Sequence, residues 1–384
     1  MAPTHPFRIA AFRHYWAGRL TAMLAQSAML LIIGWQVYNI ARETMSPAAA
    51  AAQLGFIGLI QFVPLFALTP VTGWAADRFD RRHIAWATIA LQILGAGLLA
   101  WATAAGTVSL GLLFLVSGLL GVARAFNGPA MGALAPNLVP PALLPRAIAL
   151  SSISWQAGLI AGPAIGGYLY AWTPAAAYIG SAALFGLSLL FMVLIRPVAR
   201  PEVDRMRHPL RQMIDGLSYV RTNRLVLGAI TLDLFAVFLA GANALLPIYA
   251  RDILQVGSEG LGKLSAAPAV GAVAAALYFS WRPLKRDVGA KMLGAVAVFG
   301  VATIVFGLST NFTLSLVALA VAGAADMFSV FVRSSLIQLH TPDAMRGRVG
   351  AVSQLTISAS NELGDAQSGF LAALVGPVAA AVIG

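Results

Sequence analysis

Cysteine is absent from this chain and histidine is rare, with 5 His among 384 residues. Without cysteine the protein has no disulfide bonds and no thiolate ligands for a metal. The histidines are His5, His14, His83, His208 and His340, and they form no HExxH motif of a zinc hydrolase. A catalytic carboxylate pair stays open on the residues alone. We nevertheless expect a protein that is not an enzyme and that has no metal or other cofactor.

Charged residues are also scarce. They make up 10% of the chain and hydrophobic residues 59%, against about 25% and 45–50% in soluble domains. The mean hydropathy is +0.81. A helix crosses a hydrocarbon core of about 30 Å with about 20 apolar residues, so there is room for about twelve spans. Backbone groups must be paired in lipid and the apolar runs are too long for barrel strands, so we expect an all-α integral membrane protein.

Apolar windows bounded by Gly, Pro and charged residues predict eleven spans. The windows are 17–40, 52–76, 83–104, 108–132, 143–170, 175–196, 224–249, 260–281, 288–308, 312–337 and 349–371. A further apolar run begins near Val375 and stops at Gly384, which is too short for a crossing. We expect that this last helix is truncated or ends inside the membrane.

The formal net charge is +11, because 25 Lys and Arg face only 14 Asp and Glu. Most of the positive residues fall in alternate connections between the predicted spans, which places the N-terminus in the cytoplasm. The exceptions are Arg42, Arg124, Arg251, Lys263 and Arg333. This distribution indicates membrane topology and contact with anionic lipid headgroups rather than binding of nucleic acid.

The longest polar stretch, residues 197–223, divides the chain into two halves. We expect an N-terminal six-helix bundle over 1–196, a cytoplasmic linker over 197–223, and a C-terminal bundle over 224–384 whose twelfth helix is incomplete. At an offset of 202 residues, ten of the thirty positions in 140–169 are identical to those in 342–371. Two parallel six-helix repeats related by a pseudo-two-fold axis would produce this pattern.

The repeat conserves small residues and changes charged ones. Gly162 matches Gly364 and Gly167 matches Gly369, whereas Arg124 aligns with Asp326 and Pro163 with Asp365. The two halves have therefore diverged at ionisable positions.

Three motifs stand out. The first, Gly73-Trp-Ala-Ala-Asp77-Arg78-Phe-Asp80-Arg81-Arg82, is predicted to be a short hinge loop between two apolar segments. In the second, Arg124-Ala-Phe-Asn127-Gly128-Pro129, an arginine interrupts an apolar window. The third is Gly158-Leu-Ile-Ala-Gly162-Pro163-Ala-Ile-Gly166-Gly167, whose glycines permit close packing and whose proline bends a helix.

These motifs resemble those of the major facilitator superfamily. The first is similar to the loop between helices 2 and 3 of that family, the second to a helix-4 motif associated with proton coupling, and the third to the helix-5 signature of proton-coupled antiporters. Together with Gly34-Trp35-Gln36-Val37-Tyr38 and Thr341-Pro-Asp-Ala-Met-Arg346-Gly-Arg348, they resemble the drug:proton antiporter branch, which includes enterobactin and macrolide exporters. The resemblance implies a major facilitator fold of two six-helix bundles and transport by alternating access.

The resemblance also implies roles for individual residues. The first motif implies a conformational latch in which Asp77 lies near the start of helix 11, and its residues are Gly73, Asp77, Arg78, Arg81, Arg82, Arg346 and Arg348. The third motif implies a seal against ion leak, formed by Gly158, Gly162, Pro163, Gly166 and Gly167. A helix that is merely well packed is the alternative for the third motif.

The implied function is that of a proton-coupled antiporter, which exports an amphipathic small molecule such as a siderophore or a drug. Its expected partners are this substrate, protons and membrane lipids, without nucleic acid, and we expect a monomer in the inner membrane of a bacterium. The alternative is a lipid or lysolipid facilitator on the same fold.

Four acids lie within otherwise apolar windows: Asp233, Asp326, Glu362 and Asp365. Ionisable groups inside a membrane are functional candidates by default, and burial disfavours a charged carboxyl. We predict that Asp233 and Asp326 are the leading proton carriers and that Arg124 is their basic partner. A static hydrogen bond is the alternative for each acid, a snorkelling side chain for Arg124, and an outer gate for Glu362 and Asp365.

Aromatic and amide side chains in cavity-lining helices of this superfamily suit a bulky amphipathic ligand. The candidates are Trp35, Gln36, Gln61, Asn127, Trp155, Gln156, Asn243, Gln354, Ser358 and Asn361. In the window 349–371, Gln354, Ser358, Asn361 and Asp365 recur at helical spacing as one polar stripe. Packing against lipid or in the core is the alternative for each tryptophan.

Overall fold

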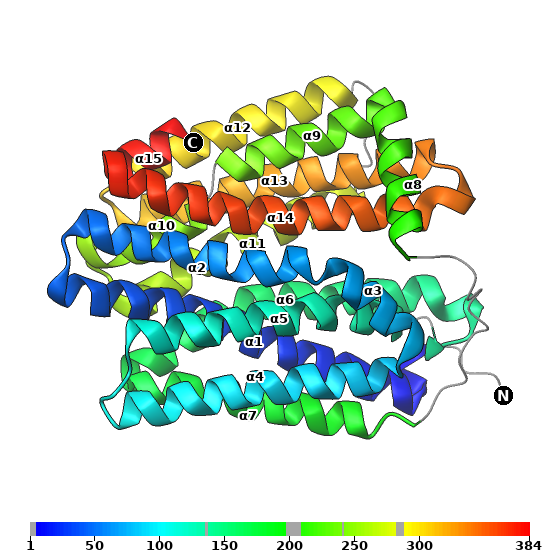
Figure 1. Ribbon diagram of the computed structural model, residues 1–384. Coiled ribbons are helices and arrows are strands. Elements are labelled where there is room, and N and C mark those ends of the chain that lie inside the picture. The colour runs from blue at the N-terminus through cyan, green and yellow to red at the C-terminus, as the bar shows by residue number, and fades with distance from the viewer. Residues whose placement is uncertain (1–4, 135–136, 197–208, 240–241, 282–287) are drawn as a thin grey trace. The chain divides into compact units, whose positions relative to one another are not determined.

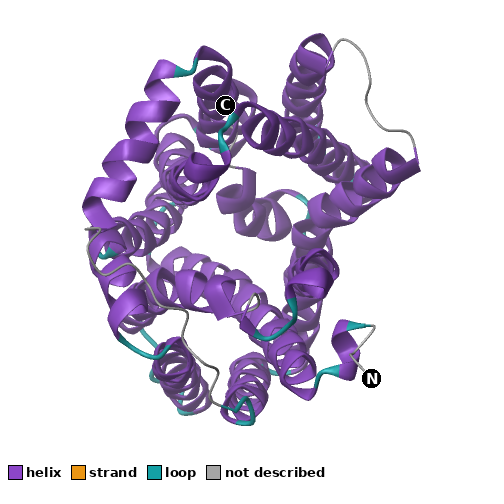
Figure 2. Ribbon diagram, turned by 90° about the vertical axis from the view of Figure 1, so that its right-hand side faces the viewer, coloured by secondary structure: helices purple, strands orange, loops and turns teal. Residues whose placement is uncertain are grey.

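The protein is helical throughout the computed structural model, in which residues 5–134, 137–196, 209–239, 242–281 and 288–384 are described. Its longer helices are α1 (Ala10–Thr44), α2 (Pro47–Ala67), α4 (Arg81–Ala104), α5 (Leu110–Leu134), α6 (Leu144–Trp172), α7 (Pro174–Val193), α8 (Pro209–Thr222), α9 (Arg224–Leu239), α11 (Gly257–Trp281), α12 (Val288–Leu308), α13 (Phe312–His340) and α14 (Asp343–Val375) (Figure 1). The shorter elements are α3 (Thr69–Arg78), α10 (Ala242–Ile248), α15 (Pro377–Ile383), a π-helical turn at Tyr249–Ile253, and 3-10 turns at Pro6–Arg8 and Pro141–Leu143. No strand occurs in these ranges (Figure 2).

Ten helical segments of the described chain are long and apolar enough to cross a membrane. They coincide with the first ten predicted windows, so the prediction of an all-α integral membrane protein is confirmed. The eleventh window lies in α14, which is a helix of 33 residues but does not belong to the ten. Polar residues such as Asn361, Glu362 and Asp365 lower the hydropathy of this helix.

Capping residues determine where several helices begin. Asn311 precedes α13, and its side-chain oxygen accepts a hydrogen bond from Leu314 N at 3.0 Å. Thr173 caps α7 in the same way through Ala176 N at 3.1 Å, and Pro174 follows at the first helical position. Such side chains satisfy backbone N–H groups that have no partner inside the helix.

The predicted hinge loop at 73–82 is wrong in its extent. Helix α3 continues to Arg78, so only Phe79 and Asp80 separate it from α4. Asp80 is the N-cap of α4 and accepts a hydrogen bond from Arg82 N at 2.9 Å. The carboxylate accepts a hydrogen bond from a backbone N–H group at the start of α4, so this helix can begin without a longer loop.

The predicted window 52–76 is also interrupted. Helix α2 ends at Ala67 and α3 begins at Thr69. Proline causes this break, because Pro64 lies inside α2 and Pro70 lies in the first turn of α3. Each proline removes one backbone donor and disfavours helical geometry in the residue before it.

Contacts group the chain into two compact units. The first consists of Met1–Gln36, Val63–Arg205 and Ser258–Gly262, and the second of Val37–Phe62, Met206–Gly257 and Lys263–Gly384. In the first unit α4 packs against α5 and α7, and in the second α12 packs against α13 while α14 packs against α8 and α9. The predicted division at 197–223 stays a prediction.

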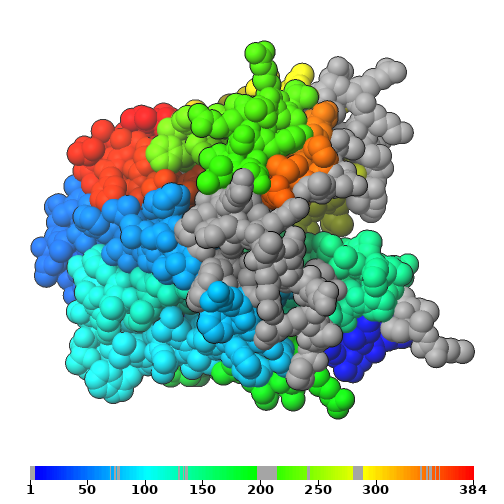
Figure 3. Space-filling model, turned by 45° about the vertical axis from the view of Figure 1, so that its right-hand side comes forward, coloured from blue at the N-terminus to red at the C-terminus, as the bar shows by residue number. Residues whose placement is uncertain are grey.

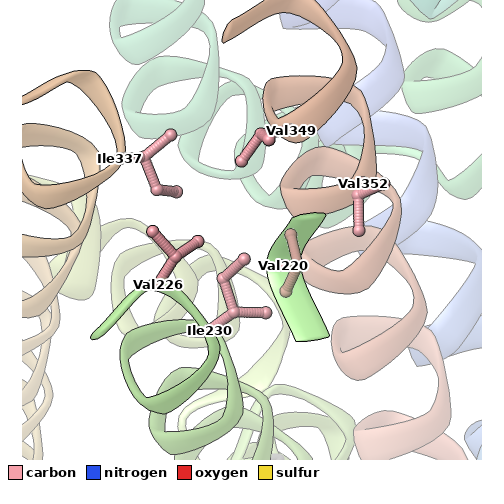
Figure 4. Packing of buried hydrophobic residues seen from close by; sticks show 6 residues of the cluster. All are labelled: Val220, Val226, Ile230, Ile337, Val349 and Val352. Atoms are coloured by element: carbon pink, nitrogen blue, oxygen red, sulfur yellow. The ribbon is translucent and has the colours of Figure 1, made fainter. Parts of the chain in front are cut away.

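Helix α8 lies in the predicted linker, of which residues 197–208 fall outside the described chain. It packs against α14 and α9, and Figure 3 shows its green surface beside the orange surface of the chain around the end of α13 and the start of α14. Tyr219 Oη donates to His340 O at 2.6 Å, and Asp215 pairs with Arg348 at 3.1 Å. An apolar cluster completes this contact between α8, α9, α13 and α14. It consists of Val220, Val226, Ile230, Ile337, Val349 and Val352 (Figure 4).

Candidate functional site

A buried ion pair lies inside the second unit. Asp233 of α9 pairs with Arg333 of α13, and the two residues are only 4% and 3% exposed. Ala229 and Val332 on the same two helices form a buried apolar cluster with Met292 of α12. Removing one partner of such a pair would leave an uncompensated charge away from water. The pair is therefore a strong constraint on how α9 and α13 pack.

The second predicted proton carrier, Asp326, lies on α13 seven residues before Arg333. Two helical turns separate them, so both project from the same face of the helix. Asp326, Asp233 and Ser329 line a small pocket between α9, α12 and α13. Among the described residues Asp326 has no hydrogen-bond or ion-pair partner. The structure thus brings the two leading acids together around one cavity.

Arg333 is a residue that the sequence reasoning did not assign. It lies within a predicted span, whereas the prediction names Arg124 as the basic partner of the acids. Arg124 lies half-buried on α5 in the first unit. The spacing of seven between Asp326 and Arg333 was the signal that could have identified Arg333, because it places an acid and a base on one helical face. The role of Arg124 stays a prediction.

The polar stripe of α14 belongs to the second unit. Glu362 is buried and Asp365 is half-buried, while Ser358 is half-buried and Asn361 is exposed. The side chain of Gln354 falls outside the described residues. Helix α2 approaches α14 closely here, since a Cβ on Gly58 would lie 2.7 Å from Glu362 O.

The glycines of the third motif form a packing face on α6. A Cβ would lie 2.6 Å from the Met23 side chain at Gly158, 2.7 Å from Leu24 O at Gly162, and 3.0 Å from Ala28 at Gly166. The residue numbers of the contacting positions increase together along α1 and α6, so these two helices run parallel. A side chain at any of these positions would force the two helices apart.

The other side of the motif packs against α11. Gly167 lies against the Ser258 carbonyl, and a Cβ on Gly262 would be 2.7 Å from Pro163 O. Both contacts lie within the first unit. The third motif therefore brings the backbone of α6 against the backbones of two other helices, and the sealing role given to it stays a prediction.

Parts of the predicted latch lie outside the described residues. These are Gly73 and the side chains of Asp77 and Arg346. Of the others, Arg78 is exposed at the end of α3, and Arg82 is buried, where it pairs with Asp80 at 2.7 Å and donates to Ile195 O at 3.0 Å. These hydrogen bonds from Arg82 hold the pKa of the Asp80 carboxyl below its ordinary value. Arg348 pairs with Asp215 of α8.

The predicted cavity residues differ widely in exposure. Trp35, Gln36 and Gln61 are buried, whereas Trp155, Asn243 and Asn361 are exposed and Asn127 and Gln156 are half-buried. Gln36 is held in place, because its side chain accepts from Tyr178 Oη at 2.5 Å and donates to Thr103 Oγ1 at 3.3 Å. Two such bonds leave Gln36 better suited to structure than to ligand contact.

A polar clasp joins the end of α1 to the π-helical turn in the second unit. Tyr38 Oη donates to Asp252 Oδ2 at 2.6 Å, and Arg42 Nε lies 3.4 Å from the same oxygen. Arg251 donates to Asn39 O at 3.1 Å. The sequence reasoning missed this clasp, because the partners lie more than 200 positions apart.

Comparison with known proteins places the chain among transporters. The sequence model of the Major Facilitator Superfamily matches residues 20–364. The enterobactin exporter EntS of Shigella boydii serotype 18 is 27% identical over 384 residues, which cover 98% of this chain and 88% of that protein. EntS of Escherichia coli O1:K1 is 27% identical over 386 residues with the same coverage.

Two solved structures share the fold. A bacterial homologue of the human lysosomal transporter Spinster superposes with a TM-score of 0.72 at 16% identity, over 94% of this chain and 83% of that one. A bacterial homologue of the iron transporter ferroportin superposes with a TM-score of 0.68 at 17% identity, over 97% and 96%.

Proposed function

Because this chain belongs to the Major Facilitator Superfamily and has the all-α membrane fold of its transporters, we propose that it is a proton-coupled exporter. Its cargo in this proposal is an amphipathic small molecule such as a siderophore or a drug, moved by alternating access. The names of its EntS relatives support export. We place it as a monomer in a bacterial inner membrane with its N-terminus in the cytoplasm, where the alternating Lys and Arg distribution supports this orientation.

The observation that carries proton coupling is the group of Asp233, Arg333 and Asp326. Asp233 and Asp326 line one pocket inside lipid-spanning helices, and Arg333 pairs with Asp233 alone. Charged groups in such places are costly to insert and are kept where they move ions or protons. Asp326, which has no paired cation in the described part of the chain, is the first site for a proton.

Protonation would change the packing of the second unit. A proton that binds a carboxylate oxygen of Asp326 neutralises that acid, and one that binds Asp233 removes the charge that holds Arg333. In the second case Arg333 becomes an unpaired buried cation, which favours a rearrangement of α9 against α13. Release of the proton restores the carboxylate and the ion pair. Arg124 remains the proposed partner of an ionised acid in another state of the cycle.

The packing of α6 supports the directionality of this proposal. Close backbone contact of Gly162 with α1 and of Gly167 with α11 supports the sealing role that we propose for this helix. Tight small-residue packing is how membrane helices approach each other most closely. A seal of this kind lets a proton gradient be used for transport rather than lost by leak.

The test is export of enterobactin by the purified full chain in proteoliposomes under an imposed pH gradient. We expect Asp326→Asn and Asp233→Asn each to lower gradient-driven export by at least about tenfold, because neither amide exchanges a proton. The matched control is Ser329→Ala, which changes the same cavity without changing charge and should keep export near the original rate.

Full gradient-driven export by both Asn variants would overturn the assignment of these acids. Export that continues unchanged after the gradient is collapsed with a protonophore would overturn proton coupling itself. That second outcome would favour the alternative of a lipid or lysolipid facilitator, for which a fluorescent lysolipid is the substrate to measure.

A further inference from the structure

Arg19 has an unusual setting on α1. Its Nη1 donates to Tyr15 Oη at 2.7 Å, and its guanidinium carbon lies 5.6 Å from the ring centroid of Trp155 on α6. Its Nε is buried and has no hydrogen-bond partner within the described residues. A guanidinium has five N–H donors in a fixed fork, so Arg19 retains donor capacity for another group.

A second unsatisfied group lies at the same depth. Tyr15 Oη donates to Met131 O of α5 at 3.1 Å. Arg19 follows Tyr15 by one turn, and Asn127 precedes Met131 by one turn. Because α6 runs parallel to α1 and only a short connection joins α5 to α6, α5 runs opposite to α1. The turn of α1 that carries Arg19 and the turn of α5 that carries Asn127 therefore lie at the same level along the two helices. Asn127 Oδ1 is likewise buried without a partner among the described residues.

The first half of the chain provides little negative charge for Arg19. Residues 1–196 contain only three acids, Glu43, Asp77 and Asp80. Glu43 lies 24 residues further along α1, which is about 36 Å at 1.5 Å per residue. Asp77 and Asp80 lie outside the candidate spans, and Asp80 pairs with Arg82. Any anion that binds at Arg19 would thus meet a positive environment with few competing carboxylates.

We infer that Arg19, Trp155 and Asn127 form a binding site for an aromatic anion. This inference rests on the proposed export function, because it names the chemical class of the exported molecule. The anionic group binds the free donors of Arg19, which is the geometry that guanidinium prefers for carboxylates. Trp155 is 42% exposed although it carries the guanidinium at its ring, so part of the indole remains open for a stacked ligand ring.

Asn127 refines the chemical class. Its free Oδ1 accepts hydrogen bonds, so a ligand that also carries a hydroxyl or amide N–H next to the acid would satisfy it. A buried polar atom that is satisfied only in the complex gives selectivity, because a ligand without the donor leaves it unpaired. The site therefore selects hydroxylated or amidated aromatic acids over aliphatic acids and over neutral aromatic compounds.

The experiment measures binding of 3-hydroxy-2-naphthoate to the purified full chain in detergent by isothermal titration calorimetry. We expect Arg19→Gln and Trp155→Leu each to weaken binding by about tenfold or more. Arg19→Lys keeps the charge but loses the planar fork, so it should bind more weakly than the original protein and more tightly than Arg19→Gln. Neutral 3-hydroxy-2-naphthamide and aliphatic decanoate should bind much more weakly than the naphthoate.

Two matched controls lie on the same helices. Arg13 is an exposed arginine of α1, and Trp172 is a 79% exposed tryptophan at the end of α6. Arg13→Gln and Trp172→Leu should bind the naphthoate like the original protein. Size-exclusion profiles and melting curves show whether each variant is folded, and Arg19→Lys still tests the site if Arg19→Gln does not fold.

Equal binding by all variants, equal weakening by the controls, or equal affinity for the naphthamide would each overturn the inference. A complete lack of naphthoate binding would do the same. Failure of the proposed function is distinguishable, because it is read from gradient-driven transport rather than from binding. A site that binds the naphthoate as expected in a protein that does not export would leave the inference standing and remove the proposed function.

Discussion

Helices α6 and α14 are equivalents in the internal repeat, and they pack through the same small residues. Gly162 lies against α1, and its counterpart Gly364 lies against α9, where a Cβ would be 2.9 Å from Val237 O. Gly167 lies against α11, and its counterpart Gly369 lies against α2 at Gly55. Helix α1 is the first span of the N-terminal half, and α9 is the first span of the C-terminal half. Each glycine therefore has the same kind of neighbour in both halves. The repeat seen in the sequence therefore describes a repeat in packing.

The two halves differ in the charges that they hold inside the membrane. The second contains Asp233, Asp326, Glu362 and Asp365, whereas the first has no acid between Asp80 and its end at residue 196. Packing has thus been retained while polarity has diverged. This difference suggests a division of labour in which the second half handles protons and the first half handles an anionic cargo.

The largest expected effect comes from the buried Arg333. Arg333→Leu should lower the free energy of unfolding by about 3–5 kcal/mol, because it leaves Asp233 buried without its cation. Thermal or denaturant unfolding in detergent measures this loss. The double variant Asp233→Asn with Arg333→Leu should recover part of it, since no uncompensated carboxylate remains.

Arg221→Gln is the control, because Arg221 is an exposed arginine on α8. It should change the unfolding free energy by no more than about 0.5 kcal/mol. An Arg333→Leu variant as stable as this control would show that the buried pair is not a structural constraint, and the contrast between the halves would lose its basis.

Substitutions at the repeat-related glycines should have a smaller effect of equal size in both halves. Gly167→Ala and Gly369→Ala each place a methyl group against a backbone and should cost about 1–3 kcal/mol of unfolding free energy. Gly186→Ala on α7 is the control, since a Cβ there would meet nothing within 4 Å.

The unfolding midpoints of the three variants show whether the two glycines contribute equally to stability. If only Gly167→Ala were destabilising, the repeat would be a repeat of sequence without shared packing. If both behaved like Gly186→Ala, the close helix approach would itself be wrong.

The smallest effect concerns the start of α4. Asp80→Ala should cost about 1 kcal/mol, because it removes the N-cap of α4. The pKa of Asp80 is lower in the folded protein than its ordinary value of about 3.9. This contribution is therefore complete above that ordinary value and is lost as the pH falls through the lower folded-state pKa.

Unfolding experiments at several pH values measure this dependence. A pH-independent difference between Asp80→Ala and the original protein would contradict the role of the charge.

The sequence predicted the fold well because lipid imposes a simple rule. Every span has to be a long apolar helix, so windows of hydropathy located ten of them. Hydropathy did not predict where helices break or where loops are short. Pro64 and Pro70 break the second predicted span at Leu68, and a hydropathy profile does not detect such a break. The N-cap at Asp80 makes the following loop shorter than the cluster of charged residues predicted.

The candidate site was predicted only in part. Asp233 and Asp326 were identifiable because acids are rare in apolar windows, and they do line one cavity. Their pairing depends on which helices adjoin, and this follows from tertiary packing rather than from local pattern. For that reason Arg333 and the setting of Arg19 emerged only from the structure, and the latch at Asp77 and Arg346 stays a prediction.

The contact between Tyr38 and Asp252 has a consequence for how the protein is made. The two residues are 214 positions apart in the chain, and yet they meet through a hydrogen bond of 2.6 Å. The ribosome completes the first transmembrane helix long before it reaches Asp252. The end of that helix must therefore wait in the membrane for its partner, and the final assembly of the earliest segment depends on one of the later ones.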